Sequence, residues 1–241
     1  LGPWVASYNA DAIGFDLSCC EMVILSHGHI DHAGGLFDIR KKMNAQNIPL
    51  IIHSDAFKNR LFKLQQSTIN LPPPNKSLLA QVGYDIIEKN QPSMWLDDCI
   101  LVTGEIPRTN NFEIGLSNHY SNENGKIESE PLIRDDQAIV LNVKDKGLVV
   151  ISGCAHSGII NTINYAKKLT EEDNIYAVLG GMHLEGKAFE EIIPRTVDEL
   201  KKNKPKFIIP CHCTGFHAAN EMVKQMPESI IPNSVGTTYV L

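Results

Sequence analysis

The stretch Ser26-His27-Gly28-His29-Ile30-Asp31-His32 decides what fold and what chemistry this chain is expected to have. Three imidazoles and one carboxylate stand within positions 27–32. The apolar run 22–25 precedes them and predicts a buried strand that ends at this motif. Side chains alternate along an extended segment, so His27 and His29 should point the same way. A turn into a helix would then bring Asp31 and His32 to the same space.

These four side chains predict a metal centre. A run this dense would press imidazoles against one another, and a cation is what stabilises such an arrangement. Imidazole combined with carboxylate suits zinc, iron, nickel or manganese. We therefore expect two divalent ions, zinc first, with iron, manganese and nickel as alternatives.

Apolar and polar segments alternate along the rest of the chain, which predicts a layered α/β arrangement with helices on the outer faces of sheets. The expected strands are 22–25, 49–53, 100–103, 137–143, 147–152, 176–179, 207–209 and 236–240. The expected helices are 34–42, 56–63, 158–169, 188–202 and 215–225. Segment 67–77, with three prolines, is expected to be a loop, and the polar segment 118–130 an exposed excursion.

Composition narrows the class of protein. A length of 241 residues suits one large domain. The net charge of −6 and the lack of a Lys/Arg stripe disfavour nucleic acid as a partner without excluding it, and a small-molecule substrate is the expected partner. No apolar run approaches the roughly 18 residues that cross a membrane. Six cysteines, two of them adjacent, predict free thiols and a cytoplasmic location. A homodimer is left open.

Three motifs together resemble the metallo-β-lactamase superfamily. The H-x-H-x-D-H run follows an apolar strand and is followed by Gly34-Gly35-Leu36. The run 148–154 resembles the family strand that normally ends in Gly-Asp, and 207–212 resembles its last metal motif. The resemblance covers nearly the whole chain. It implies one domain over residues 1–241 with a four-layer αββα fold, two packed mixed sheets with outer helices.

The chain departs from the family pattern at two metal positions. Cys154 stands where the family has a bridging aspartate, and no histidine occurs near 102–105. His156 is the expected substitute ligand, with Glu105 as a weaker candidate. The resemblance then implies a first metal on His27, His29 and His156, and a second on Asp31, His32 and His212. Cys154 is interpreted as a bridging thiolate, a redox-sensitive ligand or a packed thiol.

Four further motifs, 103–108, 153–158, 180–184 and 210–215, resemble one branch of the superfamily. That branch centres on 7,8-dihydropterin-6-methyl-4-(β-D-ribofuranosyl)aminobenzene-5′-phosphate synthase. The resemblance implies a metal-dependent hydrolase acting on a phosphate ester or a related pterin-pathway substrate. The family's early β-hairpin is not recognisable before His27, so we expect a segment to be missing near residues 9–12.

Other residues are assigned roles with alternatives. Asp31 is expected to move a proton at the leaving group, and His183, after two glycines, to bind substrate or act as a general acid. Arg108 is a candidate for an anionic substrate group. Cys211 and Cys213 are expected to be packed, with a soft second metal site as the alternative. His119 and His217 are expected on the surface.

Three classes of function stay open at this point. The first is the phosphate-ester enzyme, with a nuclease as a variant that the net charge disfavours. The second is an acyl hydrolase of the lactonase or β-lactamase type. The third is a metal or redox sensor that uses Cys154, Cys211 and Cys213.

Overall fold

The computed structural model describes residues 4–240. It is a mixed α/β structure, as predicted, and it divides into two compact units. The first unit contains the described residues up to Asn90 together with Leu116–Pro131. The second contains Gln91–Gly115 and the described residues from Leu132 onward. Among residues 4–240, no helix is both long and apolar enough to span a bilayer.

A three-stranded parallel sheet in the order β1-β2-β5 forms the core of the first unit. Its strands are β1 (Val23–Ile24), β2 (Ile48–Ile52) and β5 (Tyr84–Glu88). The helices of this unit are α1 (Val5–Ala12), α2 (Ile30–Ala33), α3 (Leu36–Arg40) and α4 (Lys76–Gln81). Ile48 and Leu50 of β2 are fully buried in one core with Leu36 and Leu79. Helix α1 runs through residues 9–12, and the missing segment expected there stays a prediction.

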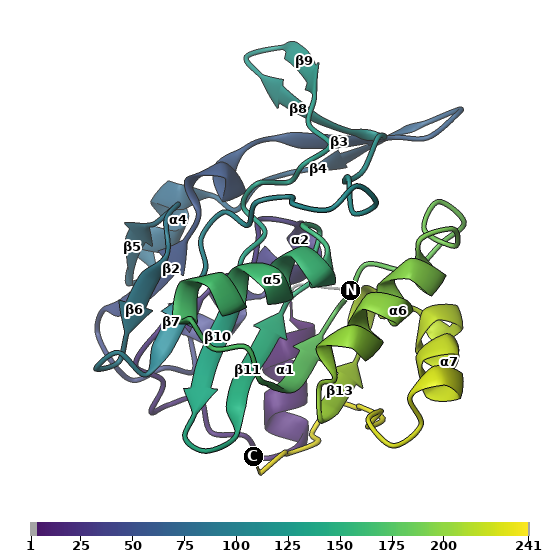
Figure 1. Ribbon diagram of the computed structural model, residues 1–241. Coiled ribbons are helices and arrows are strands. Elements are labelled where there is room, and N and C mark those ends of the chain that lie inside the picture. The colour runs from purple at the N-terminus through teal and green to yellow at the C-terminus, as the bar shows by residue number, and fades with distance from the viewer. Residues whose placement is uncertain (1–3, 241) are drawn as a thin grey trace. The chain divides into compact units, whose positions relative to one another are not determined.

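The second sheet of this unit is antiparallel, in the order β4-β3-β8-β9, and two hairpins form it (Figure 1). Its strands are β3 (Arg60–Lys63), β4 (Thr68–Leu71), β8 (His119–Glu123) and β9 (Lys126–Ser129). The predicted helix at 56–63 is therefore wrong. The loop predicted at 67–77 is confirmed only at 67 and 72–75, and the polar excursion at 118–130 is a β-hairpin. A short 3₁₀ helix, η1 (Ser54–Phe57), precedes β3 instead.

Tertiary pairing explains why β3 is not helical. Arg60 is buried, with 1% of its side chain exposed, and its Nε lies 3.1 Å from Oε2 of Glu130. A buried guanidinium requires such a partner, because an unpaired charge away from water costs several kcal/mol or more. Glu130 is 70 residues further along the chain, so no local pattern could indicate this pair.

A six-stranded mixed sheet in the order β13-β12-β11-β10-β7-β6 organises the second unit. The strands are β6 (Ser93–Trp95), β7 (Ile100–Val102), β10 (Ala138–Val143), β11 (Gly147–Ser152), β12 (Ile175–Gly180) and β13 (Phe207–Pro210). Strands β11, β12 and β13 are parallel, and the others pair antiparallel. The parallel strands are almost continuously apolar, which is typical of strands buried on both faces.

Helices α5 (Ile159–Thr170), α6 (Ile193–Asn203) and α7 (Phe216–Gln225) pack on one face of this sheet, and α5 lies across its middle strands (Figure 1). Leu148, Val150 and Val178 point into this core, whereas Val149 and Ala177 form a separate cluster. The expected helix at 188–202 begins only at α6, where a proline occupies its first turn. The prediction of a strand at 236–240 is wrong, because this largely exposed segment pairs with no strand among the described residues.

A remote carboxylate holds the start of α5. Glu113 is buried; its Oε1 accepts a hydrogen bond from the Ile160 N–H at 2.9 Å, and its Oε2 accepts one from the Asn161 N–H at 2.9 Å. Oε2 also accepts one from Asn110 Nδ2 at 2.7 Å. Burial raises the pKa of Glu113, and these hydrogen bonds oppose that rise. A negative group at a helix N-terminus satisfies otherwise orphaned N–H groups, so Glu113 fixes where α5 begins.

We predict that Glu113→Ala lowers the free energy of unfolding by about 3 kcal/mol, because two buried helix N–H groups lose their acceptor. Urea unfolding measures this change. Glu190→Ala, at an exposed glutamate, is the matched control and should change stability by less than about 0.5 kcal/mol. Equal small effects in both variants would mean that Glu113 does not hold the helix.

Candidate metal centre

The loop after β1 gathers the four residues of the H-x-H-x-D-H motif in the first unit. His29 is extended and precedes α2, which carries Asp31 and His32. The ring centroid of His27 lies 4.7 Å from that of His29 and 4.2 Å from that of His32. Oδ2 of Asp31 lies 3.6 Å from Nε2 of His32. The strand-to-helix turn expected from the sequence therefore brings all four side chains together.

A further histidine, from a hairpin distant in the sequence, contacts this loop. Nε2 of His119 on β8 lies 3.1 Å from Nε2 of His29. Nδ1 of His119 lies 3.0 Å from the carbonyl oxygen of Glu130, which can only accept a hydrogen bond. In a neutral His119 ring, Nδ1 thus donates and Nε2 accepts. His29 then donates from Nε2, and its Nδ1 is the nitrogen that carries a lone pair.

Ser26 orients the other two imidazoles. Its Oγ lies 3.1 Å from Nδ1 of His27 and 3.4 Å from Nδ1 of His32. A hydroxyl oxygen has two lone pairs and can accept from both Nδ1–H groups, which leaves the Nε2 atoms as lone-pair donors. Metal-binding histidines usually make such outer contacts through their second nitrogen. The donor set and its outer contacts therefore fit divalent metal ions.

Close backbone packing explains Gly28 between the two histidines. A Cβ at this position would lie 2.2 Å from the Ala56 carbonyl oxygen and 2.7 Å from the Ala56 Cα. These are backbone atoms that cannot rotate away. Any larger residue would push His27 and His29 off the 3₁₀ turn η1.

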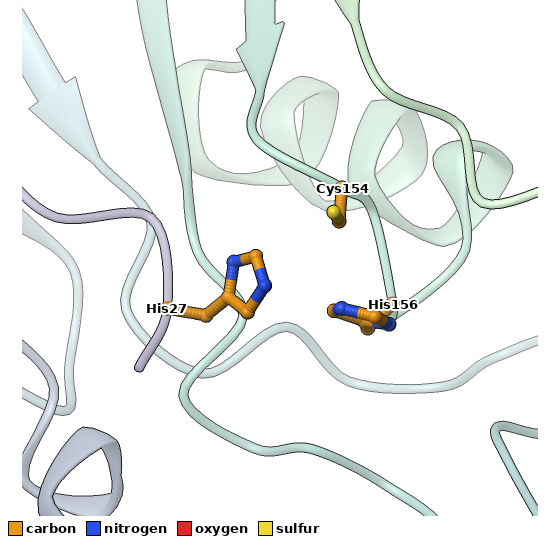
Figure 2. A group of neighbouring side chains, drawn as sticks. All are labelled: His27, Cys154 and His156. Carbon is orange, nitrogen blue, oxygen red and sulfur yellow. The ribbon is translucent and has the colours of Figure 1, made fainter. Parts of the chain in front are cut away.

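In the second unit, Cys154 lies at the centre of a group of donor atoms. Cys154 and His156 lie on the segment that follows β11 (Figure 2). The Cys154 sulfur lies within 4.8 Å of a ring nitrogen of His156 and of a ring nitrogen of His212. The same sulfur lies within 4.8 Å of a His183 nitrogen and of the Cys213 sulfur. Cys154 itself is buried, with 3% of its surface exposed.

Buried polar groups hold the segment that carries Cys154 and His156. Oδ2 of Asp136 accepts a hydrogen bond from the Ser157 N–H at 2.9 Å. Complete burial raises the pKa of Asp136 to about 6, and the Ser157 N–H opposes that rise. Arg108 donates to the carbonyl oxygen of His156 at 3.4 Å and to that of Leu132. These contacts hold the peptide group between His156 and Ser157.

The two cysteines beside His212 have different surroundings. Sγ of Cys213 lies 3.5 Å from the carbonyl oxygen of Cys154, and the Cys154 and His183 side chains lower the pKa of the Cys213 thiol. Burial instead raises the pKa of the Cys211 thiol. Cys213 therefore joins a group of donor atoms, and the packing role expected for Cys211 stays a prediction.

A family model described as the metallo-beta-lactamase superfamily matches residues 5–167. The chain belongs to this superfamily. It is 33% identical over 230 residues to the 7,8-dihydropterin-6-methyl-4-(beta-D-ribofuranosyl)-aminobenzene-5'-phosphate synthase of Methanocaldococcus jannaschii, a match that covers 92% of this chain and 75% of the relative. An uncharacterized protein of the same archaeon is 34% identical over 202 residues, which is 84% of this chain and 72% of that protein.

A solved structure is similar over almost the whole length. It is Tm1679, described as a metal-dependent hydrolase of the β-lactamase superfamily, with a TM-score of 0.80 and 22% identity. The match covers 98% of this chain and 84% of Tm1679. The expected metallo-β-lactamase fold is thus confirmed, and at this level of identity the likeness concerns the fold alone.

Some residues that the sequence suggested as metal ligands or substrate contacts lie apart from the donor atoms, and one buried histidine was expected on the surface. Oε1 of Glu105 lies 3.8 Å from Nε of Arg134, and Glu105 joins no donor group among the described residues. The guanidinium of Arg108 contacts backbone carbonyls, and its substrate role stays a prediction. His119, expected on the surface, is fully buried, because its polar stretch forms a hairpin. His217 is exposed, as expected.

We predict that Gly28→Ala lowers the free energy of unfolding by about 1–3 kcal/mol, because the new methyl group overlaps the Ala56 backbone. Thermal and urea unfolding of the metal-free protein measure it. Glu21→Ala, at an exposed residue before β1, is the control and should stay within about 0.5 kcal/mol of wild type. An unchanged Gly28→Ala protein would contradict the close packing.

Proposed function

We infer that this protein is a metal-dependent hydrolase whose ligands are the six residues expected from the sequence. His27, His29 and His156 would hold one divalent ion, and Asp31, His32 and His212 a second, with zinc as the first candidate. The observation that carries this inference is the clustered H-x-H-x-D-H loop with its oriented nitrogens. The nitrogens of His156 and His212 beside one sulfur support the assignment in the second unit.

When bound, two divalent ions would supply Lewis-acid charge and a nucleophilic water of lowered pKa. Asp31 is suited to move the proton. Its carboxylate is 37% exposed and lies at the start of α2. During hydrolysis, Asp31 would take a proton as the water oxygen bonds to the reacting centre. As the ester bond breaks, the same proton would pass to the leaving oxygen.

A phosphate ester is the first substrate class to test. The 33% identical archaeal relative is named as the synthase of a ribofuranosyl-aminobenzene phosphate. This name supports a phosphorylated small molecule as the substrate, and more specifically a pterin-related one. The acyl-hydrolase alternative differs in the bond that breaks and uses the same residues. The two are therefore separated by substrate preference alone.

The described surroundings of His183 are aromatic and carry no contact that identifies its role. Its ring packs against His156, with centroids 4.2 Å apart, and against Phe189 at 4.9 Å. Its Nδ1 is buried and has no hydrogen-bond partner among residues 4–240. A general acid needs contact with the substrate, so the catalytic role predicted for His183 from the sequence stays a prediction.

We predict that the wild-type protein, purified without added metal, contains at least two equivalents of divalent metal, and that Asp31→Ala contains about one equivalent less. Elemental analysis gives the content. Hydrolysis of bis(p-nitrophenyl) phosphate and p-nitrophenyl phosphate should fall at least about 100-fold in the same variant, since both a ligand and the proton carrier are lost.

His217→Ala is the matched control, because His217 is an exposed histidine, and it should keep both metal content and rate. Wild-type protein without stoichiometric metal would contradict the proposed function. Two equivalents of metal with turnover of lactones but of no phosphate ester would retain the metallohydrolase and replace the substrate class.

The contact between His119 and His29 gives a separate prediction. His119→Phe keeps a buried ring but removes the nitrogen that accepts from His29. We expect the affinity for zinc to fall about 10–100-fold, as for other outer-shell partners of metal-binding histidines. Competition with a chromophoric chelator measures it. His119→Gln, which offers an amide oxygen as acceptor, should lose less; equal affinity in all three proteins would contradict the contact.

A further inference from the structure

We propose that Cys154, His183 and Cys213 form a thiolate-rich site for a soft metal ion, in addition to the ligands of the proposed hydrolase centre. This inference goes beyond the proposed function and does not depend on it, since all three residues belong to the second unit. The two thiols and one imidazole make a donor set that selects zinc, cadmium or cuprous copper over magnesium or manganese.

Three neighbouring parallel strands bring these residues together. Cys154 follows β11, His183 follows β12 and Cys213 follows β13, and these strands are adjacent in the sheet. The carboxyl ends of parallel strands lie at the same edge. The two sulfurs and one His183 nitrogen all lie within 4.8 Å of one another. Donor atoms around a tetrahedral zinc ion are roughly 3.5–3.8 Å apart, so small side-chain rotations suffice.

Backbone contacts hold the two later loops in place. The N–H groups of Leu184 and Glu185 donate to the Cys213 carbonyl oxygen at 3.0 and 3.2 Å. The Met182 N–H donates to Oγ1 of Thr214 at 3.2 Å. His183 and Cys213 therefore lie in loops that are already joined. A metal ion would meet an arranged pair of donors and would not have to order the loops itself.

A glycine makes room for the sulfur atoms. A Cβ on Gly181 would lie 2.7 Å from the Cys213 sulfur and 3.1 Å from the Cys154 Cα. It would also lie 2.5 Å from the Gly153 carbonyl oxygen. Only glycine at position 181 allows the loops that follow β11, β12 and β13 to approach this closely. The sequence Gly180-Gly181-Met182-His183 thus provides both the space and the imidazole.

The His183 ring supplies an independent observation. Its Nδ1 is buried without a hydrogen-bond partner among the described residues, although a buried polar atom normally has one. Its backbone φ is +46°, a left-handed value that a residue with a side chain adopts at a cost. A ring that ligates a metal through one nitrogen accounts for both the buried polar edge and the constrained backbone.

Cobalt titration of the reduced, metal-free full-length chain tests the proposal. Thiolate-to-cobalt charge transfer absorbs in the near ultraviolet, whereas imidazole and carboxylate ligands give no such band. Wild type should show this band with the intensity of two thiolates. Cys213→Ser should lose about half of it, because one of the two sulfur ligands is removed. Cys211→Ser, at the neighbouring cysteine, is the matched control and should keep the full band.

A second measurement needs no variant. Zinc should protect Cys213, which is half-buried, from alkylation by iodoacetamide and should leave the alkylation of Cys211 unchanged, as mapped by mass spectrometry of the peptides. Protection of Cys213 supports the site. Unchanged alkylation of Cys213 in zinc, or a cobalt band that Cys213→Ser leaves unchanged, would overturn it and leave Cys154 to the hydrolase centre. Failure of the proposed hydrolase would appear instead as absent turnover with the sulfur band intact.

Discussion

The parallel alignment of β11, β12 and β13 is the constraint on which the chemistry of the second unit depends. The loop after each of these strands contains one non-glycine residue with a positive φ angle: Ala155, His183 and His212. Such conformations cost of order 1–3 kcal/mol each. Packing of the apolar strands against α5, α6 and α7 offsets that cost, because these strands are buried along nearly their whole length. The sheet therefore stores conformational strain where the donor atoms project.

The two units offer different kinds of donor. The loop after β1 presents imidazoles and a carboxylate, and its outer contacts come from a hydroxyl and a further imidazole. The strand ends of the second unit present imidazoles together with two sulfurs. Harder ligands suit zinc, iron, manganese and nickel alike, whereas thiolates narrow the choice to softer ions. A Cys154 at the position where the sequence resemblance expects an aspartate would therefore shift the preference of that site toward softer ions.

Similarity of fold between this chain and Tm1679 extends well beyond similarity of sequence. Tm1679 has a TM-score of 0.80 with 22% identity, so the same arrangement of strands and helices tolerates large changes in sequence. The contacts in the loops are specific to individual side chains: Ser26 and His119 contact imidazoles of the H-x-H-x-D-H loop, and Gly181 leaves room for the Cys213 sulfur. The proposed function would depend on these side chains and not on the fold as such.

The sequence by itself determined the superfamily, the α/β class and the four residues of the H-x-H-x-D-H loop. These features depend on short-range spacing, on short apolar runs that form strands and on a turn that a few neighbouring residues specify. Only the tertiary structure decided that His119 contacts His29, that Arg60 lies in a strand beside Glu130, and that Cys213 joins Cys154 and His183. The physical reason is sequence separation. Hairpin pairing and parallel strand order bring together residues dozens of positions apart, and no local pattern of side chains carries that information.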